Sequence, residues 1–134
     1  MSKLLAALTT LMLLSVPAAG SAIRIDLKKA NQSTSPLKYS LRTSTDHGLV
    51  TVSLELPRKQ VPLDHLWRIY LVVRKANKAT LVSVPLQTTP DGDVLKTELL
   101  LDPSAMKDVE IWIRTGEHAP LAETIYAIDV GSFQ

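Results

Sequence analysis

The 134-residue chain contains no cysteine, and this absence excludes several kinds of protein at once. No disulfide can staple the fold, and no thiolate can act as a catalytic nucleophile. No acyl-acceptor cysteine of the bacterial lipoprotein type follows the N-terminal segment. The fold must therefore be stabilised by a packed apolar core, which a chain of this size can supply.

The chain also has few glycines and little net charge. The five glycines form no phosphate-binding loop, and no serine lies in a glycine-flanked elbow. Fifteen Lys and Arg oppose 13 Asp and Glu, so removal of Lys3 with an N-terminal segment leaves 14 against 13, a net charge of +1. We therefore expect no enzyme activity, no cofactor and no binding to nucleic acid.

The N-terminal segment has the composition of an export signal. Lys3 precedes a predominantly apolar run, Leu4–Val16, and small residues follow it as far as Ala22. Gly20 and Ala22 suit the two small positions before a cleavage site. A membrane anchor is the alternative, but a spanning helix needs about 20 apolar residues. We predict a signal peptide over residues 1–22 and a periplasmic or secreted product, with no stable membrane insertion after cleavage.

Residues 23–134 predict one all-β domain. Apolar and polar residues alternate with the period of a half-buried strand, and turn residues such as Asp46-His47-Gly48 and Pro90-Asp91-Gly92-Asp93 separate the runs. The pattern is typical of an immunoglobulin- or fibronectin-III-like β-sandwich of seven to eight strands. The predicted strands are 23–28, 37–42, 50–56, 66–74, 82–86, 95–101, 109–113 and 126–130.

Three segments depart from the simple pattern of alternating strands and turns. Residues 63–74 also have apolar positions at helical spacing, but a helix there would be apolar all round, so a strand is favoured. Residues 102–108 predict one helical turn, capped by Asp102 and opened by Pro103. Residues 30–36 are interpreted as a linker. The predicted core contains Ile69, Leu71, Leu99, Ile111 and Ile113.

An immunoglobulin-type order makes 66–74 and 109–115 neighbours in one sheet, with 121–130 beside 109–115. Loops 57–65 and 116–120 then share one end of the sandwich. His65 and His118 lie on these loops, each preceded by an acid, and form a weak candidate for a metal site. His47 falls at the opposite end.

The same order predicts a surface rich in aromatic and cationic residues. Tyr70 and Trp112 lie side by side at the parity opposite to the core, and arginines surround them: Arg68, Arg74 and Arg114. Solvent-facing Trp, Tyr and Arg anchor protein interfaces, whereas flat aromatic rings also stack on sugars. The competing interpretation is that a second layer, strand 23–28 or loop 57–65, covers this face.

From these residues we expect a non-catalytic, exported module that binds another protein. A carbohydrate-binding module using the same aromatic residues is the first alternative. A small periplasmic metal-binding protein using His65 and His118 is the second.

Overall fold

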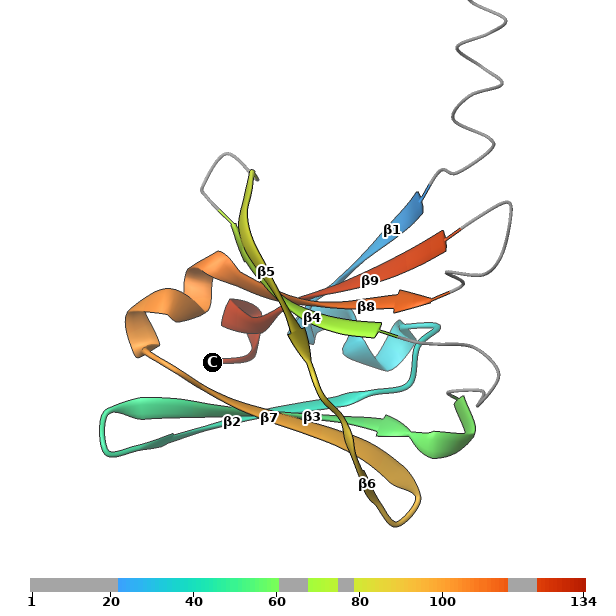
Figure 1. Ribbon diagram of the computed structural model, residues 1–134, viewed down its shortest axis with the longest axis horizontal. Coiled ribbons are helices and arrows are strands. Elements are labelled where there is room, and N and C mark those ends of the chain that lie inside the picture. Colours follow the sequence, from blue (N-terminus) through green and yellow to red (C-terminus); the bar gives the residue numbers. More distant parts are fainter. Residues whose placement is uncertain (1–21, 61–67, 75–78, 116–122) are drawn as a thin grey trace, which may run out of the picture.

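The fold is a two-layer β-sandwich, seen in a computed structural model that describes residues 22–60, 68–74, 79–115 and 123–134. One sheet, sheet A, has the strand order β1-β9-β8-β4-β5, and the other, sheet B, has the order β2-β3-β7-β6. Figure 1 shows sheet A above sheet B. The described strands are β1 Ala22–Leu27, β2 Ser40–Asp46, β3 Leu49–Pro57, β4 Arg68–Arg74, β5 Thr80–Leu86, β6 Thr89–Asp91, β7 Val94–Leu101, β8 Val109–Thr115 and β9 Glu123–Asp129.

The strand order is that of an immunoglobulin-type sandwich. In such a fold strands A, B, E and D form one sheet, and strands G, F, C and C′ belong to the other. Strands β2, β3, β7 and β6 take the first four places, and β9, β8, β4 and β5 take the second four. The predicted neighbours are confirmed, because β8 pairs antiparallel with both β4 and β9. Strand β1 adds to sheet A by pairing parallel with β9.

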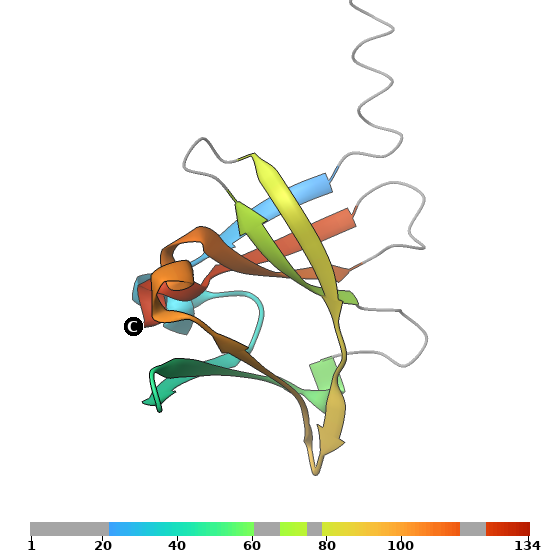
Figure 2. The same ribbon diagram turned by 60° about the vertical axis from the view of Figure 1, so that its left-hand side comes forward.

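The strand count differs from the prediction in one place. Nine strands occur in the described ranges, and the additional one is β6, which lies within the predicted turn region. The chain leaves sheet A after β5 and crosses to sheet B, where residues 89–91 pair with β7 (Figure 2). A three-residue strand has no alternation long enough to be recognised in the sequence.

Two tight turns fix the hairpin registers. At the β2–β3 turn, His47 and Gly48 both have positive φ, as a type I′ turn requires. At the β6–β7 turn, Gly92 has a φ of +60° and precedes Asp93. The Pro-Asp-Gly-Asp segment is therefore a hairpin turn, as predicted.

The described residues contain four local helices, more than the sequence indicated. The predicted turn is η3, Pro103–Asp108, and the Asp102 side chain accepts from the Ser104 N–H as its cap. Residues 30–36 were predicted to be a linker, and this is wrong for most of the segment, because η1 spans Lys29–Thr34. The Lys28 N–H donates to the Asn31 side chain, so polar side chains favour a turn there. The other two are η2, Arg58–Gln60, and η4, Val130–Phe133.

The core lies between the inner faces of the two sheets. Strand β8 contributes Val109, Ile111 and Ile113, and β3 contributes every second residue from Val50 to Leu56. Ile69, Ile111 and Ile113 are buried as predicted, whereas Leu71 and Leu99 are half-buried and pack against the core. The helical alternative for 63–74 is excluded over residues 68–74, which form β4. Within the described ranges, no helix is long and apolar enough to cross a membrane.

The central strand provides the first stability test. Ile111 is fully buried between the sheets, so Ile111→Ala should lower the free energy of unfolding by about 2–5 kcal/mol. Leu100→Ala is the control, since Leu100 is 64% exposed, and should cost under about 0.5 kcal/mol. Urea unfolding measures both values. Equal losses would contradict the assigned inner and outer faces.

The packing of η4 on η3 gives a second test. A Cβ placed on Gly131 would lie 2.9 Å from the Met106 carbonyl oxygen and 3.1 Å from the Lys107 Cα. Both are backbone atoms, so a rotamer change cannot relieve the contact. Gly131→Ala should therefore destabilise the domain by about 1–3 kcal/mol in thermal or urea unfolding. A variant as stable as the natural chain would show that η3 and η4 do not pack this closely.

Candidate functional site

The outer face of sheet A carries the residues that the sequence singled out. Tyr70 on β4 lies directly opposite Trp112 on β8, and Arg68 lies opposite Arg114. Both aromatic side chains are half-buried. We call this surface the aromatic face and define it by Tyr70 and Trp112, the acids Glu110 and Glu123, and the arginines Arg24, Arg68, Arg74 and Arg114.

A guanidinium stacks on each of the two rings. The Arg24 Cζ lies 5.4 Å from the centroid of the Trp112 ring. The Arg114 Cζ lies 5.7 Å from the centroid of the Tyr70 ring. Both distances are within the range of cation–π attraction, which is about 6 Å. The rings and cations therefore form two stacked pairs in the middle of the face.

Glu110 binds both members of one of these pairs, Arg24 and Trp112, and it also binds Arg74. Its Oε2 accepts from the Arg24 guanidinium at 2.6 Å, and its Oε1 accepts from Arg74 at 2.8 Å. The Trp112 indole N–H also donates to Oε1, at 3.2 Å. These donors come from β1, β4 and β8, so one carboxylate joins three strands of the sheet.

The donors around Glu110 determine its titration. Burial raises the pKa of Glu110, but hydrogen bonds from Arg74 and Trp112 and the charge and hydrogen bond of Arg24 outweigh that effect. The pKa therefore lies below the ordinary 4.5.

Arg114 is held in a similar way from the other side. Its guanidinium binds the Glu123 carboxylate through two nitrogens, and the Nη2–Oε2 distance is 3.0 Å. Because such a paired geometry fixes the planar group, the Arg114 side chain has little conformational freedom. Arg24 is fixed by Asp26 as well as by Glu110, with a distance of 2.8 Å from Arg24 Nε to Asp26 Oδ1.

The side chains of this face cover the sheet beneath them. Val72, opposite Glu110, and Ala127, opposite Trp112, point to the outer side and are nevertheless buried. The small Ala127 side chain leaves space for Arg24 to reach across β9 to Trp112 and Glu110. No described helix or strand packs over the face (Figures 1 and 2). The competing interpretation that strand 23–28 covers this face as a second layer is therefore wrong, because β1 lies at the edge of the same sheet. Residues 61–67 of loop 57–65, the other candidate cover, lie outside the described residues.

The histidine hypothesis falls outside the described residues. His65 and His118, the two predicted metal ligands, both lie in segments that the structure does not describe. His47 is at the β2–β3 turn, where its Nδ1 lies 2.7 Å from the Asp46 carboxylate, and both side chains are exposed. The described residues contain no group of three or more potential metal ligands.

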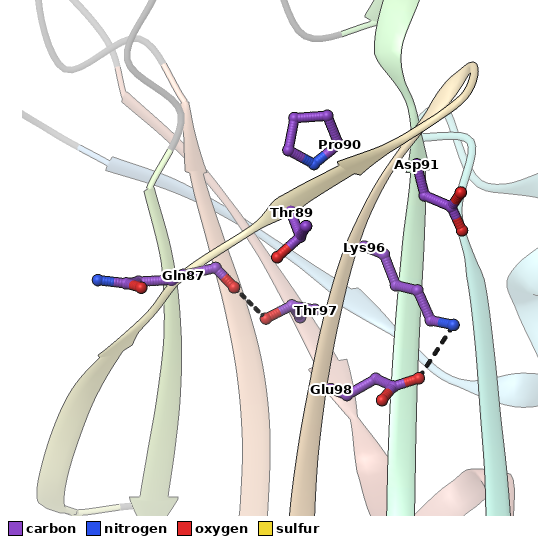
Figure 3. Close-up of a pocket in the computed structure, with 7 residues that line it drawn as sticks. All are labelled: Gln87, Thr89, Pro90, Asp91, Lys96, Thr97 and Glu98. Carbon is purple, nitrogen blue, oxygen red and sulfur yellow. Dashed lines mark hydrogen bonds and ion pairs between the residues drawn. The ribbon is translucent and has the colours of Figure 1, made fainter.

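A polar hollow lies beside β6 and β7 (Figure 3). The Thr97 hydroxyl donates to the Gln87 carbonyl at 2.6 Å, and Lys96 pairs with Glu98 at 3.0 Å. Thr97 is buried, and this bond both satisfies its hydroxyl and holds the crossover segment on β7. The hollow thus marks the point where the chain passes from one sheet to the other, and we assign it no chemistry.

The sequence did not reveal two members of the site. Arg24 and Glu123 lie on β1 and β9, whose alternation places them on a wet face but does not say which neighbours they meet. Only the parallel pairing of β1 with β9 brings Arg24 within reach of β8. Sequence separation of 86 residues between Arg24 and Glu110 leaves no local signal for this contact.

No protein-family model matches the sequence, and no curated protein matches it.

The Glu110 cluster predicts a specific loss of stability in acid. A carboxyl whose pKa is lower in the folded chain than in the unfolded chain stabilises the fold fully above the unfolded value. This contribution disappears as the pH falls through the folded value. The chain should therefore lose stability below about pH 4.5, and Glu110→Gln should lose less of it over the same interval.

Unfolding free energies at neutral pH and in acid test this prediction. Glu98→Gln is a matched control, because Glu98 is exposed and pairs only with Lys96 among the described contacts. If Glu110→Gln and Glu98→Gln changed the acid dependence equally, the Glu110 cluster would not be a source of stability.

Proposed function

We propose that this chain is an exported, non-catalytic module that binds another protein through the aromatic face. One observation carries the proposal: Tyr70 and Trp112 lie opposite each other on the open side of sheet A, each with a guanidinium stacked on its ring. Trp, Tyr and Arg are the residue types most enriched among the energetic anchors of protein interfaces.

The fixed positions of the arginines favour binding. Long side chains lose conformational entropy when a partner immobilises them, by about 0.5–1.5 kcal/mol each. Arg24 and Arg114 are already held by Glu110 and Glu123, so they have less freedom to lose. The face thus presents rigid aromatic and planar cationic groups that are still partly exposed.

The described contacts favour a protein over a glycan. Sugar stacking needs open, coplanar aromatic surfaces, and here a guanidinium occupies part of each ring face. The metal-binding alternative depends on His65 and His118 and gains no support from the described residues. Export is supported by the composition of residues 1–22.

The proposal predicts that Trp112→Ala removes binding while the fold survives. Because Trp112 is half-buried, its loss should cost less than the about 3–5 kcal/mol of a fully buried aromatic residue. A partner identified from the exported fraction should bind the purified variant at least about 30-fold more weakly, the effect of an interface hot spot. Titration calorimetry with the purified partner measures this change.

Two further variants separate binding from folding. Trp112→Phe keeps one aromatic ring while it removes the indole N–H bond to Glu110 and part of the ring area, so it should retain more affinity than Trp112→Ala. Leu100→Ala alters an exposed apolar residue on sheet B and should bind like the natural chain. If Trp112→Ala and the natural chain bound the protein partner with equal affinity, the proposal would be contradicted. If the natural chain bound a purified glycan and Trp112→Ala did not, the carbohydrate alternative would be favoured.

A further inference from the structure

Strand β5 is an exposed edge of sheet A with an unusual composition. Residues Thr80 to Pro85 are all exposed, and the apolar members include Leu81 at 53%, Val82 at 50% and Val84 at 44%. Its sequence, TLVSVPL, contains no ionisable side chain. An edge strand of this kind is a ready template for pairing with another strand.

The other three edges are protected in ways that β5 is not. Strand β1 carries Arg24 and Asp26, and strand β2 carries Arg42 and Asp46. Strand β6 has only three residues, which include a proline and an aspartate. Charge, proline and short length are the devices that prevent edge-to-edge association. Strand β5 is the one described edge that combines seven residues with no charge.

The features of β5 restrict how a partner strand pairs with it. Pro85 lies opposite Tyr70 of β4, and a proline in an edge strand places its nitrogen on the open side. Because backbone groups alternate in direction, Ser83 also directs its N–H and C=O to the open side. A bulge near Leu81 ends the regular register at the other end. Pairing is therefore centred on Ser83.

These constraints are met by a second copy of the same strand. We propose that β5 pairs antiparallel with β5 of a second copy about a two-fold axis at Ser83. Val82 of each copy then lies opposite Val84 of the other, so the two exposed valines cover each other on one face of the sheet. Since no ionisable residue is present, the symmetry brings no like charges together. A foreign strand has no comparable match here, because β5 offers no charge to select it.

The geometry also sets the size and orientation of the dimer. Pro85 and the bulge leave a short paired segment, so we expect a weak dimer whose population depends on concentration. Pairing uses the one unprotected edge among the described strands, and association therefore stops at two copies. A two-fold axis perpendicular to the sheet leaves both aromatic faces on the same side of one continuous sheet.

Sedimentation of the purified protein over three decades of concentration tests the proposal. The natural chain should pass from monomer to dimer, and Val82→Lys or Val84→Glu should each raise the dimer dissociation constant by about tenfold or more. The double variant V82K/V84E places opposite charges across the axis and should recover dimerisation. Ile23→Lys, a change at an exposed residue on the opposite edge, should dimerise like the natural chain.

The absence of cysteine permits an independent measurement. Opposed residues of a hydrogen-bonded antiparallel pair have Cα atoms about 5.5 Å apart, within the range that a disulfide spans. Mild oxidation should therefore link Ser83→Cys into a covalent dimer, whereas Leu100→Cys on sheet B should remain monomeric at the same concentration. A natural chain that stays monomeric throughout would overturn the proposal. So would dimers unaffected by both single charges, or equal cross-linking of the two cysteine variants.

Discussion

The alternation of β8 is the constraint on which the rest of the structure depends. Val109, Ile111 and Ile113 point inward and are buried, while Glu110, Trp112 and Arg114 point outward from the same seven residues. Because the side-chain period of a strand is two, a shift of one residue would place a carboxylate and a guanidinium in the core. The register with β4 and β9 is thereby fixed, and with it the pairing of Tyr70 and Trp112.

On the outer face of sheet A, long polar and aromatic side chains cover apolar residues of the sheet. Val72 and Ala127 would be exposed apolar surface if the sheet were bare, and instead the arginine and tryptophan side chains lie over them. Such a cover is stable only because the charges are paired, since a half-buried carboxylate without donors would be costly. Glu110 meets this condition with three donors. The same contacts attach β1, a peripheral strand, to the centre of the sheet.

The two edge strands of sheet A differ in charge, and each belongs to one of the two proposed binding surfaces. Strand β1 is charged and bound into the aromatic face, whereas β5 is uncharged and open. A dimer through β5 would bring two aromatic faces onto one side and allow a partner with two binding sites to engage both. The effective concentration of the second contact then raises the overall affinity without any new contact. A weak module would in this way bind a repeated or dimeric partner tightly.

The sequence alone determined the class of the fold and the parity of its strands. Period-two alternation reports local burial, so it placed seven strands close to their positions and identified the inward residues Ile69, Ile111 and Ile113 and the outward pair Tyr70 and Trp112. The strand predicted over 37–42 overlaps β2 only in its second half, because Leu37 is buried in the core outside any strand. It also indicated the Asp102-capped turn, because capping depends on adjacent residues. Tertiary structure alone decided that β1 joins sheet A beside β9, that Arg24 and Glu123 complete the aromatic face, and that β5 lies at an open edge. These features depend on contacts between residues distant in the chain, and local alternation carries no record of which strands become neighbours.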